Sequence, residues 1–165
     1  MFKIAVIDDE NVVRSGIVLE TDWGALDCAV VAEGSNGEEG LELISKYHPD
    51  IVISDIRMPK MDGIEMLKRL RESGDNTYVI FLSAYNEFSY AREAIRYSAA
   101  DYILKPYDDG ELEQAIIKIE NVLKKNKQES ELRIEEDVLA QNALIKAGKS
   151  KYVAEALDYI GEHLS

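Results

Sequence analysis

Three carboxylates, one hydroxyl and one ammonium stand at the ends of apolar runs in this sequence of 165 residues. Asp8 and Asp9 follow the first run, Asp55 ends a later one, and Ser83 and Lys105 each end another. Clustered carboxylate oxygens suit a hard cation such as Mg²⁺ or Mn²⁺. A carboxylate can also attack phosphorus to form an acyl phosphate, and a metal and a lysine would neutralise the charge in that transfer. This chemistry requires that the fold bring the five side chains together.

The apolar runs alternate with amphipathic stretches, which is typical of an α/β protein. Strands are predicted at 2–8, 28–34, 50–55, 77–84 and 101–105, and helices at 11–22, 36–48, 63–74, 86–98 and from about 108 onward. Near-continuous Val, Ile and Leu strands between helices indicate a parallel sheet covered on both faces. The predicted fold is one doubly wound α/β domain with a long C-terminal helical extension. Ligands bind outside the carboxyl ends of the strands in such sheets, so the five side chains should meet at one edge.

Composition argues against several classes of function. The net charge is −13 and no Lys/Arg cluster offers a footprint for phosphates, which disfavours nucleic-acid binding by the chain as a whole. No apolar run approaches the ~20 residues that a membrane span needs, and no signal peptide is expected. The single cysteine, Cys28, is expected to be buried and fits a reducing compartment. A nucleotide site is not indicated, because no Gly-rich phosphate loop is present.

The apolar positions of two helices predict which faces pack on the sheet. In the first helix, the residues expected to face inward are Val12, Val13, Ile17 and either Val18 or Leu19. In the helix that starts near residue 108, one stripe recurs at spacings of three and four residues and consists of Leu112, Ile116, Ile119 and Leu123.

Four separated motifs carry a family resemblance. They are VIDDE at 6–10, ISDIRMPKMDG at 53–63, FLSAY at 81–85 and DYILKP at 101–106. Together and in this order they resemble the receiver domain of two-component response regulators, over about residues 1–125. The resemblance implies a flavodoxin-like, five-stranded parallel sheet with strand order 2-1-3-4-5. It also implies a phosphorylation-switched signalling protein of the cytoplasm.

The resemblance assigns the acidic residues and the lysine. Asp55 matches the phosphoacceptor, and Asp8 and Asp9 match the acidic pair that holds Mg²⁺ (or Mn²⁺) together with Asp55. The backbone carbonyl of Arg57 matches a further metal ligand, and Lys105 matches the site lysine. The implied phosphodonor is a histidine on a sensor histidine kinase. Any enzymatic activity would be limited to phosphoryl self-transfer and slow self-dephosphorylation.

The resemblance also assigns residues that respond to phosphorylation. Ser83 matches the conformational hydroxyl, and Tyr102 matches the aromatic switch position three residues before the site lysine. Arg57 and Tyr85 stand at positions that flank the route of attacking water, where bulky groups predict a long-lived phosphate. Pro106 matches a proline whose preceding peptide bond is often cis in the family.

Two other functions remain open on the residues alone. One is a phosphohydrolase of the haloacid-dehalogenase type, which also uses a strand-end aspartate and Mg²⁺. The pattern of that class is Asp-x-Asp after the first strand, whereas Asp8 and Asp9 are adjacent in this sequence. A dimerisation module with an inactive site is the second alternative. Taken alone, Asp8 and Asp9 would serve equally well as helix N-caps.

The C-terminal third is predicted to be helical and to leave the domain. We expect a receiver domain at 1–125, a helical linker at 126–150, and the truncated start of a downstream domain at 151–165. The last segment resembles the first helix of AraC-type DNA-binding domains, so DNA would be bound only through a part that this chain does not include.

The apolar positions after residue 131 predict self-association. The stretch 125–131 is polar all round and should be a solvated bridge or a hinge. The apolar set from Leu132 to Ile145 would then pair in parallel with a second copy, alongside a dimer contact through the fourth helix, the fifth strand and the fifth helix. The alternative is that this segment folds back on residues 151–164.

Overall fold

The computed structural model describes residues 1–85 and 87–147. One compact unit comprises Met1–Glu120, and a second begins at Asn121. The strands are β1 (Phe2–Ile7), β2 (Cys28–Gly34), β3 (Ile51–Ser54), β4 (Tyr78–Ser83) and β5 (Asp101–Leu104). The helices are α1 (Asn11–Glu20), α2 (Gly37–Tyr47), α3 (Gly63–Glu72), α4 (Phe88–Arg96) and α5 (Glu111–Ala147).

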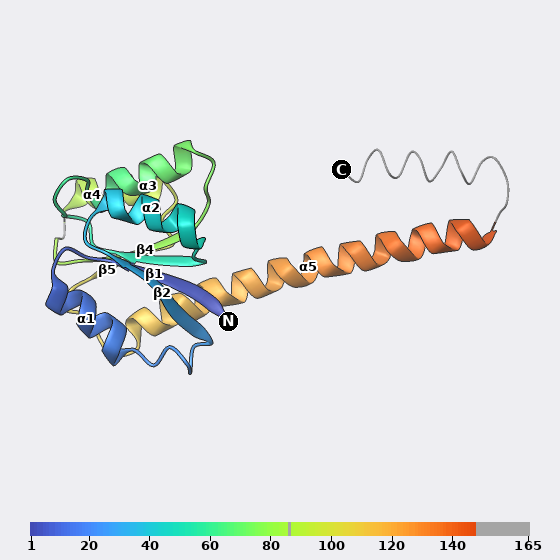
Figure 1. Cartoon of the computed structure of the whole chain (residues 1–165), viewed down its shortest axis with the longest axis horizontal. Coiled ribbons are helices and arrows are strands. Elements are labelled where there is room, and N and C mark those ends of the chain that lie inside the picture. The colour runs from blue at the N-terminus through green and yellow to red at the C-terminus, as the bar shows by residue number, and fades with distance from the viewer. Residues whose placement is uncertain (86, 148–165) are drawn as a thin grey trace. The chain divides into compact units, whose positions relative to one another are not determined.

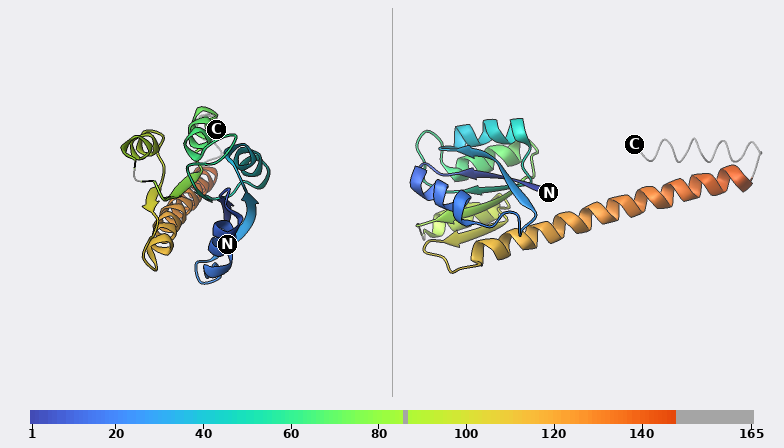
Figure 2. Two further views of the ribbon diagram at one scale, coloured as in Figure 1. Left: turned by 90° about the vertical axis from the view of Figure 1, so that its left-hand side faces the viewer. Right: turned by 60° about the horizontal axis from the view of Figure 1, so that its bottom comes forward.

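The sheet of the compact unit has the predicted strand order. All neighbouring strands are parallel, and the order β2-β1-β3-β4-β5 is confirmed. Helices α2, α3 and α4 cover one face, while α1 and the first turns of α5 cover the other (Figures 1 and 2). Because both faces are covered, the central strands are buried throughout, as the continuous apolar runs predicted.

Strand register brings the ends of the central strands level. Ile7, the last residue of β1, pairs with both Gly34 of β2 and Ser54 of β3. At the other side of the sheet, Ser83 of β4 pairs with Leu104 of β5. The residues that follow these strand ends therefore leave the sheet at the same edge.

Helix α1 packs with a rotation that differs from the sequence prediction. Ile17 is buried, and Val13 and Val18 are half-buried, as expected. The prediction was wrong for Val12, which is 87% exposed, and Leu19 is 82% exposed. These two residues are seven positions apart and share one side of the helix, away from the side on which Ile17 packs.

The turn before α3 is tied closely to the end of β3. Asp62 caps α3 by accepting a hydrogen bond from the Glu65 amide. The Gly63 amide donates to the carbonyl of Ile56 at 2.7 Å. A Cβ atom at Gly63 would lie 2.3 Å from the carbonyl oxygen of Asp55, so only glycine permits this approach. The loop that follows Asp55 is held close to the strand end for this reason.

Helix α5 is continuous from Glu111 to Ala147. Its first turns bury the predicted stripe at Leu112, Ile116 and Ile119. The polar stretch 125–131 is helical and exposed. Of the two predicted options, a solvated bridge and a hinge, the helix there agrees with the solvated bridge. The side chain of Ile145, the predicted stop at Gly148 and the helix predicted at 151–165 lie outside the described residues.

Candidate functional site

Three carboxylates gather where β1 and β3 end. One oxygen from each of Asp8, Asp9 and Asp55 lies within 4.8 Å of the others. The backbone of two of these residues continues the sheet, because the Asp8 amide donates to Gly34 and the Asp55 amide donates to Ile7. Asp8 is 2% exposed and Asp55 is 8% exposed, whereas Asp9 is open to solvent. The site thus consists of two rigid, buried carboxylates and one accessible carboxylate.

Lys105, which directly follows β5, reaches the two buried carboxylates. Its Nζ lies 3.5 Å from Asp8 Oδ2 and 3.9 Å from Asp55 Oδ2. The other oxygen of each carboxylate accepts a backbone hydrogen bond, from the Glu10 amide to Asp8 and from the Ile56 amide to Asp55. The Lys105–Pro106 peptide bond is cis. The lysine therefore faces the carboxylate oxygens that the backbone leaves free.

Burial raises the pKa of the Asp55 carboxyl above its ordinary value, and the charges of Asp8 and Asp9 raise it further. The hydrogen bond from Ile56 and the charge of Lys105 act in the opposite direction but do not cancel burial. Three like-charged carboxylates close together repel one another, and one ammonium compensates them only in part. The donor set is all oxygen and strongly anionic, so it fits a hard divalent cation such as Mg²⁺.

Ser83 and Tyr102 are joined through the residue Tyr85. The buried Ser83 hydroxyl accepts a hydrogen bond from the Tyr85 amide at 3.1 Å. The Tyr102 hydroxyl donates to the Tyr85 carbonyl at 2.5 Å, and its ring packs edge-on against Phe81. Burial raises the pKa of Tyr102. A movement of the β4–α4 loop at Tyr85 would therefore disturb both side chains.

The Arg57 side chain turns toward α4. Its Nε donates to the Tyr90 hydroxyl at 2.8 Å, and its guanidinium pairs with Glu87 at 2.5 Å. The guanidinium carbon also lies 4.0 Å from the centre of the Tyr85 ring. The sequence analysis singled out Arg57 and Tyr85 but not Glu87, because pairing across two loops leaves no local pattern in the sequence.

Comparison with known proteins decides the family. The family described as "Response regulator receiver domain" matches residues 4–117. The chain belongs to this family. The receiver domain is 35% identical over 123 residues to the transcriptional regulatory protein YesN of Bacillus subtilis, and 37% identical over 113 residues to the transcriptional regulatory protein HptR of Staphylococcus aureus. These matches cover 74% and 68% of this chain but only 33% and 44% of the relatives. The chain thus spans less than half the length of the curated relatives that it matches.

Solved structures agree with the fold of the receiver domain. The REC domain of AraT from Geobacillus stearothermophilus is 40% identical and gives a TM-score of 0.70, over 76% of this chain and 98% of that one. A CheX–CheY–BeF₃–Mg complex from Borrelia burgdorferi matches with 28% identity and a TM-score of 0.63, over 72% of this chain and 88% of that one. Within the described residues, no helix is both long and apolar enough to cross a membrane.

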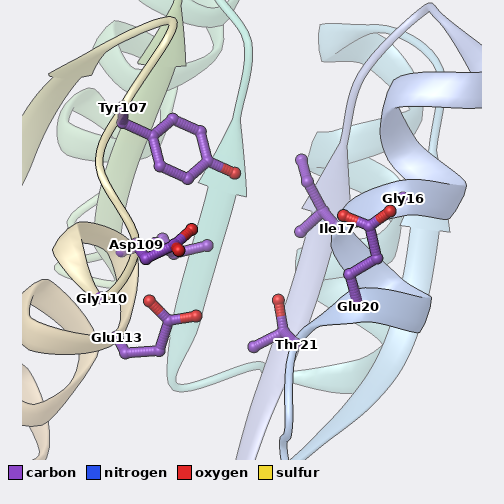
Figure 3. A pocket seen from close by; sticks show the side chains of 9 residues that line it. Gly16, Ile17, Glu20, Thr21, Tyr107, Asp109, Gly110 and Glu113 are labelled. Carbon is purple, nitrogen blue, oxygen red and sulfur yellow. The ribbon is translucent and has the colours of Figure 1, made fainter.

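A second group of carboxylates surrounds a hollow elsewhere in the receiver domain (Figure 3). The hollow has a volume of about 270 Å³ and lies between the end of α1 and the segment that leads into α5. Its charged lining residues are Glu20, Asp109 and Glu113, and Tyr107 points its hydroxyl into the gap. Burial raises the pKa of Tyr107, and the charges of Glu113 and Glu20 add to that effect. None of the five predicted site side chains lines this hollow.

Proposed function

We propose that this receiver domain accepts a phosphoryl group on Asp55 from a phosphohistidine of a sensor histidine kinase. The observation that carries the proposal is the group of Asp8, Asp9 and Asp55 within 4.8 Å, with Lys105 beside the two buried members. The Borrelia neighbour supports it, since that complex contains Mg²⁺ and BeF₃, a phosphoryl analogue. Asp8, Asp9, Asp55 and the backbone carbonyl of Arg57 are the proposed metal ligands.

The residues of this chain have distinct parts in the transfer. A carboxylate oxygen of Asp55 attacks phosphorus, the P–N bond to the donor imidazole breaks, and the imidazole leaves with the bonding electron pair. Lys105, now shared between Asp8 and Asp55, moves to an oxygen of the transferred group. Bound Mg²⁺ would supply charge neutralisation for that group. Ser83 then donates its hydroxyl hydrogen to the new phosphoryl oxygen.

The same step would act on the switch residues. If Ser83 turns toward the phosphoryl group, it gives up the hydrogen bond that it accepts from Tyr85. The Tyr85 backbone is then free to move. Such a movement would break the hydrogen bond that the Tyr102 hydroxyl donates to the Tyr85 carbonyl. We propose that this change alters the surface formed by α4, β5 and α5, and that the surface then favours dimerisation.

The output lies beyond the compact unit. The relatives are named as transcriptional regulators, and this chain covers at most 44% of those cited here. We therefore propose a receiver domain at 1–125, a linker at 126–150 and the start of a DNA-binding domain at 151–165, all in the cytoplasm. Helix α5 presents exposed apolar side chains in the linker at Leu132, Ile134, Val138 and Leu139, which a second copy would cover.

Labelling with acetyl phosphate and Mg²⁺ tests the proposed function. Intact-mass spectrometry should find one phosphoryl group on the full chain and none on Asp55→Asn. Asp62→Asn is the matched control: it removes a carboxylate from the same loop but keeps an N-cap residue, and it should label like the wild type. Full labelling of Asp55→Asn contradicts the assignment. Repeated release of phosphate without accumulation of the phosphoryl adduct would indicate a hydrolase, and neither labelling nor release would indicate an inactive site.

Sedimentation velocity tests the linker. The full chain should dimerise more strongly when phosphorylated, and Leu139→Glu should weaken the dimer by placing a charge in the apolar contact. Glu135→Gln, on the same stretch of helix, should leave it unchanged. A full chain that stays monomeric at all concentrations would favour the fold-back alternative.

A further inference from the structure

Arg14 makes three polar contacts behind the carboxylate site. From the second turn of α1, its NH1 donates to the backbone carbonyl of Asp8 at 2.6 Å and its NH2 donates to Asn11 Oδ1 at 2.7 Å. Its Nε lies 3.4 Å from Glu33 Oε1, at the end of β2. The side chain is only 16% exposed. This arginine therefore ties the β1–α1 loop to its own helix and to a neighbouring strand.

The carbonyl that Arg14 holds belongs to the peptide that joins Asp8 to Asp9. That peptide unit is planar, and it includes the Cα atoms of both residues. A short hydrogen bond to its oxygen therefore restricts the direction in which each of the two side chains leaves the backbone. Two carboxylates that bind one small cation need this restriction, because Mg²⁺ tolerates little deviation from octahedral geometry.

Arg14 and Lys105 contact different atoms of Asp8. Lys105 lies beside carboxylate oxygens, where a metal ion would compete with it. Arg14 contacts the backbone oxygen of Asp8 and leaves the carboxylate oxygens free for a ligand. Glu33 partly offsets the charge of Arg14. Removal of the Arg14 side chain should therefore change the positions of the metal ligands more than it changes the net charge at the site.

The buried Nε shows which contacts determine where the guanidinium lies. Among the described residues, this atom is buried and makes no hydrogen bond, and its approach to Glu33 is an ion pair without hydrogen-bond geometry. A buried donor without an acceptor costs free energy. The guanidinium nevertheless keeps the orientation in which it donates hydrogen bonds to the Asp8 carbonyl and to Asn11 Oδ1.

We propose that Arg14 is a positioning residue for the metal site, which orients the Asp8–Asp9 peptide so that both carboxylates face one cation. This proposal rests on the proposed function, because it requires that the site bind Mg²⁺. Removal of the outer partners of metal ligands typically lowers metal affinity by about 10- to 100-fold.

Calorimetric titration of the full chain with Mg²⁺ tests this role. Arg14→Gln should raise the Kd about 10-fold. Arg14→Lys should show a smaller rise, because an ammonium keeps the charge but cannot reach Asp8, Asn11 and Glu33 together. Glu33→Gln should change the Kd less than twofold, since the two hydrogen bonds of Arg14 remain.

Arg71→Gln is the matched control. Arg71, like Arg14, donates to backbone carbonyls, in this case those of Asp75, Thr77, Tyr97 and Ser98. These carbonyls precede β4 and β5, at the opposite edge of the sheet from the carboxylates. Arg71→Gln should therefore lower the thermal midpoint while leaving the Mg²⁺ affinity within twofold of the wild type.

The outcomes separate this proposal from the proposed function. Wild-type affinity in Arg14→Lys and Arg14→Gln overturns the role of Arg14 alone, and so does tighter binding, which would mean that its charge repels the metal. If Arg14→Gln does not fold, Arg14→Lys decides: an unchanged Kd overturns the role. A wild-type chain that does not bind Mg²⁺ overturns the proposed function and the role of Arg14 together.

Discussion

Two groups of three carboxylates occur in the compact unit, and they differ in what holds them. Asp8 and Asp55 are buried, follow central strands and are fixed by backbone hydrogen bonds. Glu20, Asp109 and Glu113 stand on helix ends and a loop around an open hollow. Solvent can screen the repulsion between the carboxylates of the second group, whereas burial leaves the repulsion within the first group largely unscreened. A count of acidic residues therefore says little about metal binding, and the rigidity and burial of the carboxylates say more.

The largest expected difference between the two groups is in Mg²⁺ affinity. Asp9→Ala should weaken binding by more than about 100-fold, since it deletes a ligand and not merely a partner of a ligand. Asp109→Ala is the matched change in the second group and should leave the Kd within twofold. Calorimetry on both variants checks this, and equal losses would show that the two groups act as one site.

Glycines next to the two groups should also differ in their effect on stability. Gly63→Ala would place a Cβ atom against the Asp55 carbonyl and the Phe81 ring, so we expect a loss of about 3 kcal/mol from overpacking. Gly110 has a φ of 88° with open space around it, so Gly110→Ala should cost only about 1 kcal/mol of backbone strain. Urea unfolding measures both, and similar losses would contradict the tighter packing at the strand ends.

Without metal, the pH dependence of stability should reveal the burial of Asp55. Its folded pKa is raised, so the folded state keeps a proton that the unfolded state releases. Stability should therefore fall as pH rises from the ordinary pKa of an aspartate through the raised value, and the loss should persist at neutral pH. Asp55→Asn in chelator should melt a few degrees higher than the wild type at pH 7.

The matched control for this prediction belongs to the second group. Glu113→Gln removes a carboxyl that is only half-buried and that lies away from the three carboxylates at the strand ends. A wild-type slope in Asp55→Asn would show that Asp55 is not the group responsible.

The smallest expected effect is on Tyr107, the tyrosine of the second group. Burial makes the largest contribution to its raised pKa, and Glu113 and Glu20 add to it. Glu113→Gln should therefore lower the pKa only slightly, still above the ordinary value of 10.0. Alkaline difference spectra against Tyr107→Phe isolate this one tyrosine. A return to the ordinary value would mean that charge, and not burial, dominates there.

The strand ends and the meeting of Asp8, Asp9 and Asp55 were predictable from the residues themselves, whereas the strand order was implied only by the family resemblance. Apolar runs with the period of strands locate the sheet, and the carboxyl ends of parallel strands must share an edge. Four motifs in order indicated the receiver family. These features depend on local sequence or on fold-level rules, so no knowledge of side-chain packing was needed.

Tertiary structure alone decided the contacts made between elements. The rotation of α1 exposes Val12, because Ile17 packs against the body of the unit. The reach of Arg14 to Glu33 and of Arg57 to Glu87 depends on how helices and loops from separate parts of the chain lie on the sheet. Periodicity specifies which face of an element is apolar, but not where a long polar side chain ends. That depends on which acceptors the packed neighbours bring within hydrogen-bond distance.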